Sequence, residues 1–117
     1  MQFKDLIKRK CPSYLDLVAE YAEDGAIDLV FVATSPYYWM NNSFIDDYYQ
    51  KLKPLLKKYK YSLTDKYDQY NLEYLDFTVE DTLDDKIPTA ITLSQATCAF
   101  PDGDGASILH ISLYYAS

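Results

Sequence analysis

Residues 27–33 read Ile-Asp-Leu-Val-Phe-Val-Ala, a mostly continuous apolar run that is rich in β-branched side chains. A run of this kind is typical of a strand that is buried on both faces, or nearly so. We therefore predict that residues 27–33 form the central strand of a sheet. The rest of the fold can be placed around this strand.

Two helices are predicted before the central strand. Residues 3–10 precede Pro12, which disfavours helical backbone in the residue before it, and are expected to form a short helix. Residues 13–25 are expected to form a second helix, with Ser13 and Asp16 as an N-terminal capping pair and Gly25 as the C-terminal stop. The spacing of one apolar helical face is met by Leu15, Val18, Ala19 and Ala22.

A third helix is predicted to follow the central strand. Ser43 and Asp46 resemble a helix start, and an apolar stripe of helical spacing runs through Phe44, Tyr48, Leu52 and Leu55. Pro54 is expected to end or kink this helix. Acids in its first turns and lysines in its tail complement the helix dipole.

From Tyr59 onward the hydrophobic period changes towards two, which indicates strands. Residues 59–64 and 72–79 are predicted as antiparallel strands around a polar turn at 65–71. Residues 89–100 and 108–115 are predicted as a hairpin around the turn at 101–105. The chain is thus expected to be one α+β domain, residues 1–117, with N-terminal helices packed on a mainly antiparallel sheet and a C-terminal β-hairpin.

Charge is segregated along the sequence. Residues 1–10 carry a net charge of +3, residues 11–50 carry −7, residues 51–60 carry +5 and residues 61–117 carry −8, which gives a total of −7. Residues 11–50 contain no Lys or Arg. A surface built from such blocks should include a strongly negative face, which attracts basic partners and repels nucleic acid and anionic membranes.

The sequence lacks the motifs of common catalytic and cofactor sites. The segment 102–105 departs from a calcium loop at Ala106, Ser107 and Leu113, and His110 has no nucleophile or acid at motif spacing. We expect no enzymatic activity, no cofactor and no metal site. Basic residues at 8–10 and 51–60 could contact nucleic acid, but the surrounding carboxylates argue against direct binding.

The location of the protein is inferred from its cysteines and apolar runs. Cys11 and Cys98 match no metal or redox spacing, so reduced thiols are expected. No apolar run has the length of a signal-peptide core or of a membrane span. We therefore expect a cytoplasmic protein without membrane contact. The expected oligomeric state is a monomer or a weak dimer.

The functional prediction rests on the carboxylates of the predicted helices and loops and on the thirteen tyrosines. In size, composition and absence of catalytic motifs the chain resembles the small acidic DNA-mimic proteins of bacteria and phages, including the kind that binds the histone-like protein HU. The resemblance implies inhibition or regulation of a basic DNA-binding protein by competition with DNA. The residues expected to bind the partner are Asp16, Glu20, Glu23, Asp24, Asp46, Asp47, Glu80, Asp81, Asp84, Asp85, Tyr37, Tyr38 and Trp39.

An alternative from the same composition is an immunity or antitoxin protein that covers the active site of a cognate nuclease toxin. Acidic complementarity would serve both functions. A mimic should compete with any duplex for its partner, whereas an immunity protein should bind one toxin. The sequence leaves both open.

Overall fold

The computed structural model describes residues 2–33, 44–66, 69–74, 87–99 and 105–115. Helix α1 (Phe3–Arg9) is followed by strands β1 (Leu15–Glu23) and β2 (Ala26–Ala33), and then by helix α2 (Phe44–Lys58). The remaining strands are β3 (Tyr61–Lys66), β4 (Gln69–Tyr74), β5 (Ala90–Ala99) and β6 (Gly105–Tyr114). This order confirms the predicted α+β class.

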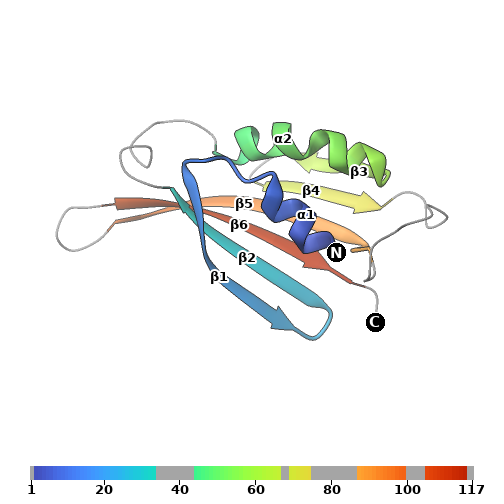
Figure 1. Ribbon diagram of the computed structural model, residues 1–117, viewed down its shortest axis with the longest axis horizontal. Coiled ribbons are helices and arrows are strands. Elements are labelled where there is room, and N and C mark those ends of the chain that lie inside the picture. Colours follow the sequence, from blue (N-terminus) through green and yellow to red (C-terminus); the bar gives the residue numbers. More distant parts are fainter. Residues whose placement is uncertain (1, 34–43, 67–68, 75–86, 100–104, 116–117) are drawn as a thin grey trace.

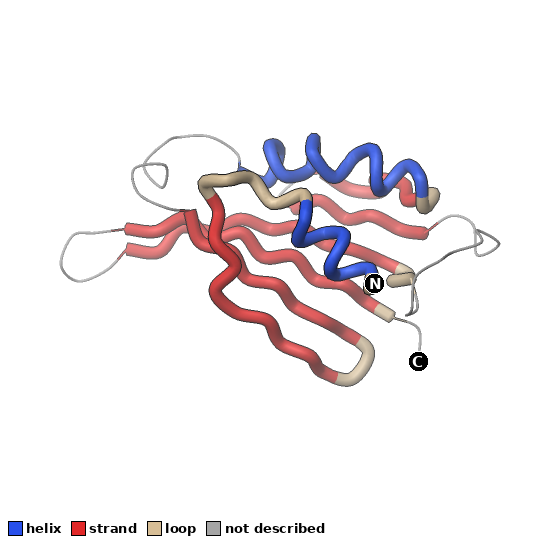
Figure 2. Tube along the Cα trace, viewed as in Figure 1, coloured by secondary structure: helices blue, strands red, loops and turns tan. Residues whose placement is uncertain are grey.

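The described strands form one six-stranded sheet in the order β1-β2-β6-β5-β4-β3. Every pair of neighbours is antiparallel. Both helices lie over the same face of the sheet, with α2 over the half that contains β3, β4 and β5 (Figures 1 and 2). The opposite face carries no described element, and we call it the open face.

Several sequence predictions are confirmed. Residues 27–33 form a strand, as predicted, within β2, which alternates buried and half-buried positions. Its predicted central place is wrong, because β2 is the second strand from the edge and β6 and β5 lie in the middle of the described sheet. The predicted C-terminal hairpin is formed by β5 and β6, which pair from Ala90 and Tyr114 to Ala99 and Gly105. The helices at 3–10 and from residue 43 onward are also present as α1 and α2.

The helix predicted for residues 13–25 is wrong. This segment forms β1, which pairs with β2 through the turn at Asp24 and Gly25. Gly25 has a φ of 77°, a conformation that glycine adopts without steric cost. The apolar spacing of this segment fits a helix, but tertiary contacts override the local pattern, because pairing with β2 extends the sheet and buries Leu15 in the core.

Two further predictions are corrected. Of the two effects predicted for Pro54, an end of the helix is wrong, because α2 continues to Lys58. Pro54 is exposed, so water can reach the carbonyl group that the missing N–H leaves without a partner. The polar turn predicted at residues 65–71 is shorter, because β3 extends to Lys66 and β4 begins at Gln69. Residues 75–79 of the predicted strand lie outside the described residues.

The core is the layer between the helices and the sheet. Helix α1 contributes Phe3 and Ile7, both with no exposed surface, and α2 contributes Tyr48, Leu52 and Leu55 of the predicted apolar stripe. The sheet contributes alternate residues of β2, β4, β5 and β6, among them Leu29, Phe31, Leu72, Ile91, Leu93, Leu109, Ile111 and Leu113. At the start of α2, the Ile45 N–H donates to Gln95 Oε1 of β5 at 3.0 Å, which attaches this helix end to the sheet.

Tyr48 of α2 joins both helices to the sheet. Its side chain is fully buried, and its ring packs edge-to-face on Phe31 of β2, with 5.3 Å between the ring centroids. Its hydroxyl donates to the Ile7 carbonyl of α1 at 2.7 Å. Burial raises the pKa of Tyr48, so the hydroxyl keeps the proton that this hydrogen bond requires.

We predict that Tyr48→Phe lowers the free energy of unfolding by about 1 kcal/mol, the typical net value of one hydrogen bond. The cost stays modest because the Ile7 carbonyl also accepts from the Lys10 N–H at 3.1 Å. Urea denaturation measures the change. Phe3→Leu, which shortens a buried side chain of α1, serves as a packing control. An unchanged stability for Tyr48→Phe would show that the hydroxyl does not hold α1 in place.

Candidate protein-interaction surface

The register of the β1–β2 hairpin sorts the side chains of β1 onto two faces. Glu20 is opposite Leu29, a core residue, so Glu20 lies on the face covered by the helices. Asp16 is opposite Val32, of the other parity in β2, so Asp16 lies on the open face. The shift in register between Leu17 and Ala19 is a β-bulge that places one extra residue in β1. The acids of the helix predicted at residues 13–25 are therefore divided between two faces of the sheet.

Glu20 is neutralised within the fold. It forms ion pairs with Lys8 and, at 3.0 Å, with Lys4, both on α1. The hydrogen bond from Lys8, assisted by the weaker one from Lys4, holds the pKa of Glu20 below its usual value despite partial desolvation. Glu20 therefore serves to attach α1 to β1 and contributes little free negative charge.

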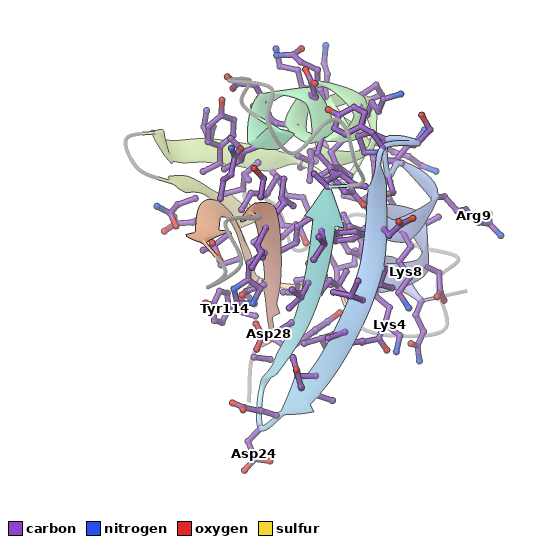
Figure 3. All side chains as sticks on the ribbon, turned by 90° about the vertical axis from the view of Figure 1, so that its left-hand side faces the viewer. Lys4, Lys8, Arg9, Asp24, Asp28 and Tyr114 are labelled. Carbon is purple, nitrogen blue, oxygen red and sulfur yellow. The ribbon has the colours of Figure 1, made fainter. Side chains whose placement is uncertain are left out.

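The remaining acids of the hairpin gather on the open face and at the hairpin end. Tyr21 is opposite Asp28, and Glu23 is opposite Ala26, which places both side chains on the same face as Asp16. We call the set Asp16, Tyr21, Glu23, Asp24 and Asp28 the acidic edge. Figure 3 shows Lys4, Lys8 and Arg9 on one side of this hairpin, Asp28 and Tyr114 on the other, and Asp24 at its end.

Exposed apolar and aromatic side chains accompany the acids on β1. Leu17, Val18 and Tyr21 are 40%, 58% and 57% exposed, and Tyr114 of β6 is 41% exposed. These are the large hydrophobic residues with high exposure in the described part of the chain. Because β1 is the last strand on its side of the sheet, half of its backbone N–H and C=O groups also point away from the sheet.

Asp28, Ser112 and His110 form a polar cluster on the open face. The Ser112 hydroxyl donates to Asp28 Oδ1 at 2.6 Å, and His110 Nε2 lies 3.3 Å from the same oxygen and 3.4 Å from Ser112 Oγ. In a nucleophile relay the hydroxyl and the carboxylate bind different ring nitrogens. Here both face Nε2, and the hydroxyl donates its hydrogen bond to the carboxylate, so the cluster orients the carboxylate of Asp28 and does not have the geometry that activates a nucleophile.

The other predicted acids lie away from the hairpin end or outside the described residues. Asp46 and Asp47 are in the first turn of α2, and Asp47 accepts a hydrogen bond from the Tyr14 hydroxyl. Burial, together with this bond, raises the pKa of Tyr14, which keeps the donor protonated. Tyr37, Tyr38, Trp39, Glu80, Asp81, Asp84 and Asp85 fall outside the described residues.

Sequence reasoning missed several residues of this surface. Asp28 was assigned only to the central strand, and Leu17, Val18, Tyr21 and Tyr114 were not among the predicted site residues. The signal that could have found them is the dipeptide Asp24-Gly25 between two β-prone segments, which is a strong indicator of a hairpin. Given that hairpin, alternation along β1 places Tyr21 and Glu23 on one face.

Among the described residues, no further candidate site is provided by cysteines, metal ligands or membrane-spanning helices. Cys11 is a free thiol whose pKa is raised by burial, which makes it a poor nucleophile, while the side chain of Cys98 is not described. No cluster of three or more His, Cys, Asp or Glu residues that could hold a metal ion occurs among the described residues. Within the same residues, neither helix has the length and apolar character to cross a membrane.

Comparison with known proteins gives no relative from which to transfer a function. The chain matches no protein-family model, no curated protein and no solved structure. We therefore infer a function from the residues of this chain alone.

We predict that Glu20→Gln lowers the free energy of unfolding at pH 7 by less than about 1 kcal/mol, as expected for a largely exposed ion pair. Because folding lowers the pKa of Glu20 from its ordinary value of 4.5, the stabilisation is present above that value and disappears as the pH falls through the lower pKa of the folded state. Urea denaturation at pH 7 and pH 3 should show a deficit at pH 7 that is smaller at pH 3.

Glu23→Gln is the matched control, because Glu23 lies on the same strand and makes none of the ion pairs found among the described residues. It should leave stability unchanged at both pH values. A loss of unfolding free energy in Glu20→Gln that is equally large at pH 3 and pH 7 would mean that Glu20 acts through packing and not through its charge.

Proposed function

We propose that this protein is an acidic binding domain that attaches to a basic DNA-binding protein through the acidic edge and competes with DNA for it. The observation that supports this most is the composition of one edge strand. On β1, Asp16 and Glu23 flank the exposed side chains of Val18 and Tyr21, no Lys or Arg lies on the strand, and neither acid forms an ion pair with a described residue. Carboxylates supply attraction, and Val18 and Tyr21 supply contact area.

The charge expected of the partner's surface follows from the charges of the acidic edge. Asp16, Glu23 and Asp24 lack a cationic partner among the described residues, and Asp28 is held beside the single histidine. Lys4 and Lys8 of α1 are directed to Glu20 on the other face. A surface of this sign steers lysine- and arginine-rich proteins towards it and repels nucleic acid.

The edge position of β1 adds a second mode of attachment. An exposed edge strand can accept an extended segment of another chain through backbone hydrogen bonds. A basic extended segment would satisfy both the unpaired backbone groups and the carboxylates. The charged side chains and the bulge after Leu17 discourage pairing with a second acidic copy, because like charges opposite each other in a sheet are destabilising.

Competition with DNA follows from how the carboxylates are distributed. Asp16 and Glu23 lie at the two ends of one face of β1, roughly 20 Å apart for seven residues of extended chain. A groove that binds duplex phosphates through several cations can therefore meet several carboxylates at once. The negative charges sit on a rigid strand, so little conformational entropy is lost when the complex forms.

The test is displacement of a labelled DNA duplex from a histone-like protein of the HU type, at low and at moderate salt. We expect displacement that weakens as the salt concentration rises, because both ligands bind through charge. Glu23→Lys should weaken the displacement at least about tenfold, since it replaces an attraction with a repulsion inside the site.

Glu73→Lys is the matched control. Glu73 is also an exposed strand glutamate on the open face, but it lies on β4, four strands from β1 and roughly 19 Å away. It changes the net charge by the same amount. Equal losses for both variants would show that only net charge matters and would overturn the acidic edge as the site. No displacement at low salt would reject competition with DNA and favour a single cognate toxin as partner.

A further inference from the structure

A second feature lies on the other half of the molecule, between the last turns of α2 and strands β3 and β4. It is a pocket of about 670 Å³, which is within the range of small-molecule sites. Its apolar wall is formed by Tyr49, Pro54, Leu56, Tyr61 and Leu72. Its charged residues are all lysines, Lys53, Lys57 and Lys60, which we call the lysine rim.

The lysine rim is not needed to balance charge inside the fold. None of the three lysines forms an ion pair with a carboxylate among the described residues. Lys57 lies in the last turn of α2 and complements the helix dipole. Lys53 lies one turn earlier and four residues from Lys57, a spacing at which like charges repel each other.

The backbone conformation of Lys60 is also unfavourable. Its φ is 63°, in the left-handed region, where glycine is the usual residue after a helix and a side chain is unfavourable. Its N–H donates to the Lys57 carbonyl at 3.1 Å, so this conformation closes the end of α2. A cation is present at a position that favours glycine, and that cation lines the pocket. Residues held in unfavourable conformations are concentrated at functional sites.

The wall of the pocket is firmly held. The Tyr61 hydroxyl donates to the Pro88 carbonyl, and Tyr49 packs edge-to-face on Tyr70, with 4.8 Å between ring centroids. Leu72 is 2% exposed and Leu56 is 3% exposed. Lys53 Nζ lies 5.7 Å from the centre of the Tyr49 ring, so one rim cation is placed directly against the wall.

We propose that this pocket binds an amphipathic organic anion, with an anionic head at the lysine rim and an apolar body against the wall. Three cations that form no ion pair with a described carboxylate favour a carboxylate or phosphate head. The aromatic and leucine side chains favour a ligand with an aliphatic or aromatic body, because binding removes these side chains from water. This proposal is independent of the acidic edge, which lies on the opposite edge of the sheet.

The test uses the fluorescence of anilinonaphthalene sulfonate, an aromatic anion, bound to the folded protein, and its displacement by decanoate. We expect saturable binding and displacement by decanoate. Decanol, which lacks the charge, and inorganic phosphate, which lacks the apolar body, should displace the dye far less well. Equal displacement by decanol would reduce the site to an apolar patch, and equal displacement by phosphate would reduce it to a charge cluster. Either result would overturn the proposal.

Variants on the same helix locate the site. Lys53→Gln combined with Lys57→Gln should weaken decanoate binding by about tenfold, because it removes two of the three rim cations. Lys51→Gln combined with Lys58→Gln removes the same charge from exposed lysines of α2 that do not line the pocket, and should change affinity less than about twofold. Equal losses in the two double variants would overturn the assignment of the pocket.

We further predict opposite effects of Lys60→Gly on stability and on binding. Glycine relieves the left-handed strain, so the midpoint of thermal unfolding should rise by a few degrees. Decanoate affinity should fall several-fold, because one rim cation is lost. Differential scanning fluorimetry and the dye displacement measure the two effects. A rise in stability with unchanged affinity would show that Lys60 takes no part in binding.

Discussion

The hydrogen bond from Tyr48 to the Ile7 carbonyl is the contact on which the arrangement of charge depends. Helix α1 has seven residues and is too short to be stable alone, so tertiary contacts must hold it. Tyr48 binds its last turn, while Phe3 and Ile7 are buried in the core. Once α1 is fixed over the sheet, its lysines reach Glu20 on the covered face of β1. Asp16, Glu23 and Asp24 then have no cationic partner among the described residues, which leaves the acidic edge negative.

Sequence patterns predicted an element correctly where the local pattern of apolar residues and the tertiary contacts favour the same kind of element. Residues 27–33 and the stripe of α2 are examples, because their patterns match only one kind of element. Residues 13–25 fit two patterns, since Leu15, Val18, Ala19 and Ala22 match a helical face while the same segment also has strand-like character. The conflict is decided by pairing with β2, a contact between segments that local spacing does not report. Asp24-Gly25 was the one local signal that favoured the hairpin.

The candidate sites were harder to predict than the fold because they join residues distant in sequence. Asp28 and Ser112 are 84 residues apart, yet β2 and β6 are neighbours and place them opposite each other. The pocket combines Tyr49 with Leu72, which requires knowledge of where α2 lies on the sheet. The lysine cluster was visible in the sequence, but its interpretation as a complement to the helix dipole accounted only for the last turn of α2. The positive φ of Lys60 has no sequence signature.

An anion-binding pocket and an acidic edge are compatible in one small protein because charge acts locally in salt. The net charge is −7, and a uniform distribution of it would repel any anion. The acidic edge belongs to β1 and the lysine rim to the α2–β3 side, at opposite ends of a six-stranded sheet. Five strand spacings separate these edges by roughly 24 Å, about three screening lengths at physiological ionic strength. Each surface therefore keeps the sign of its own residues, and the sheet acts as the spacer that makes two opposite binding preferences possible.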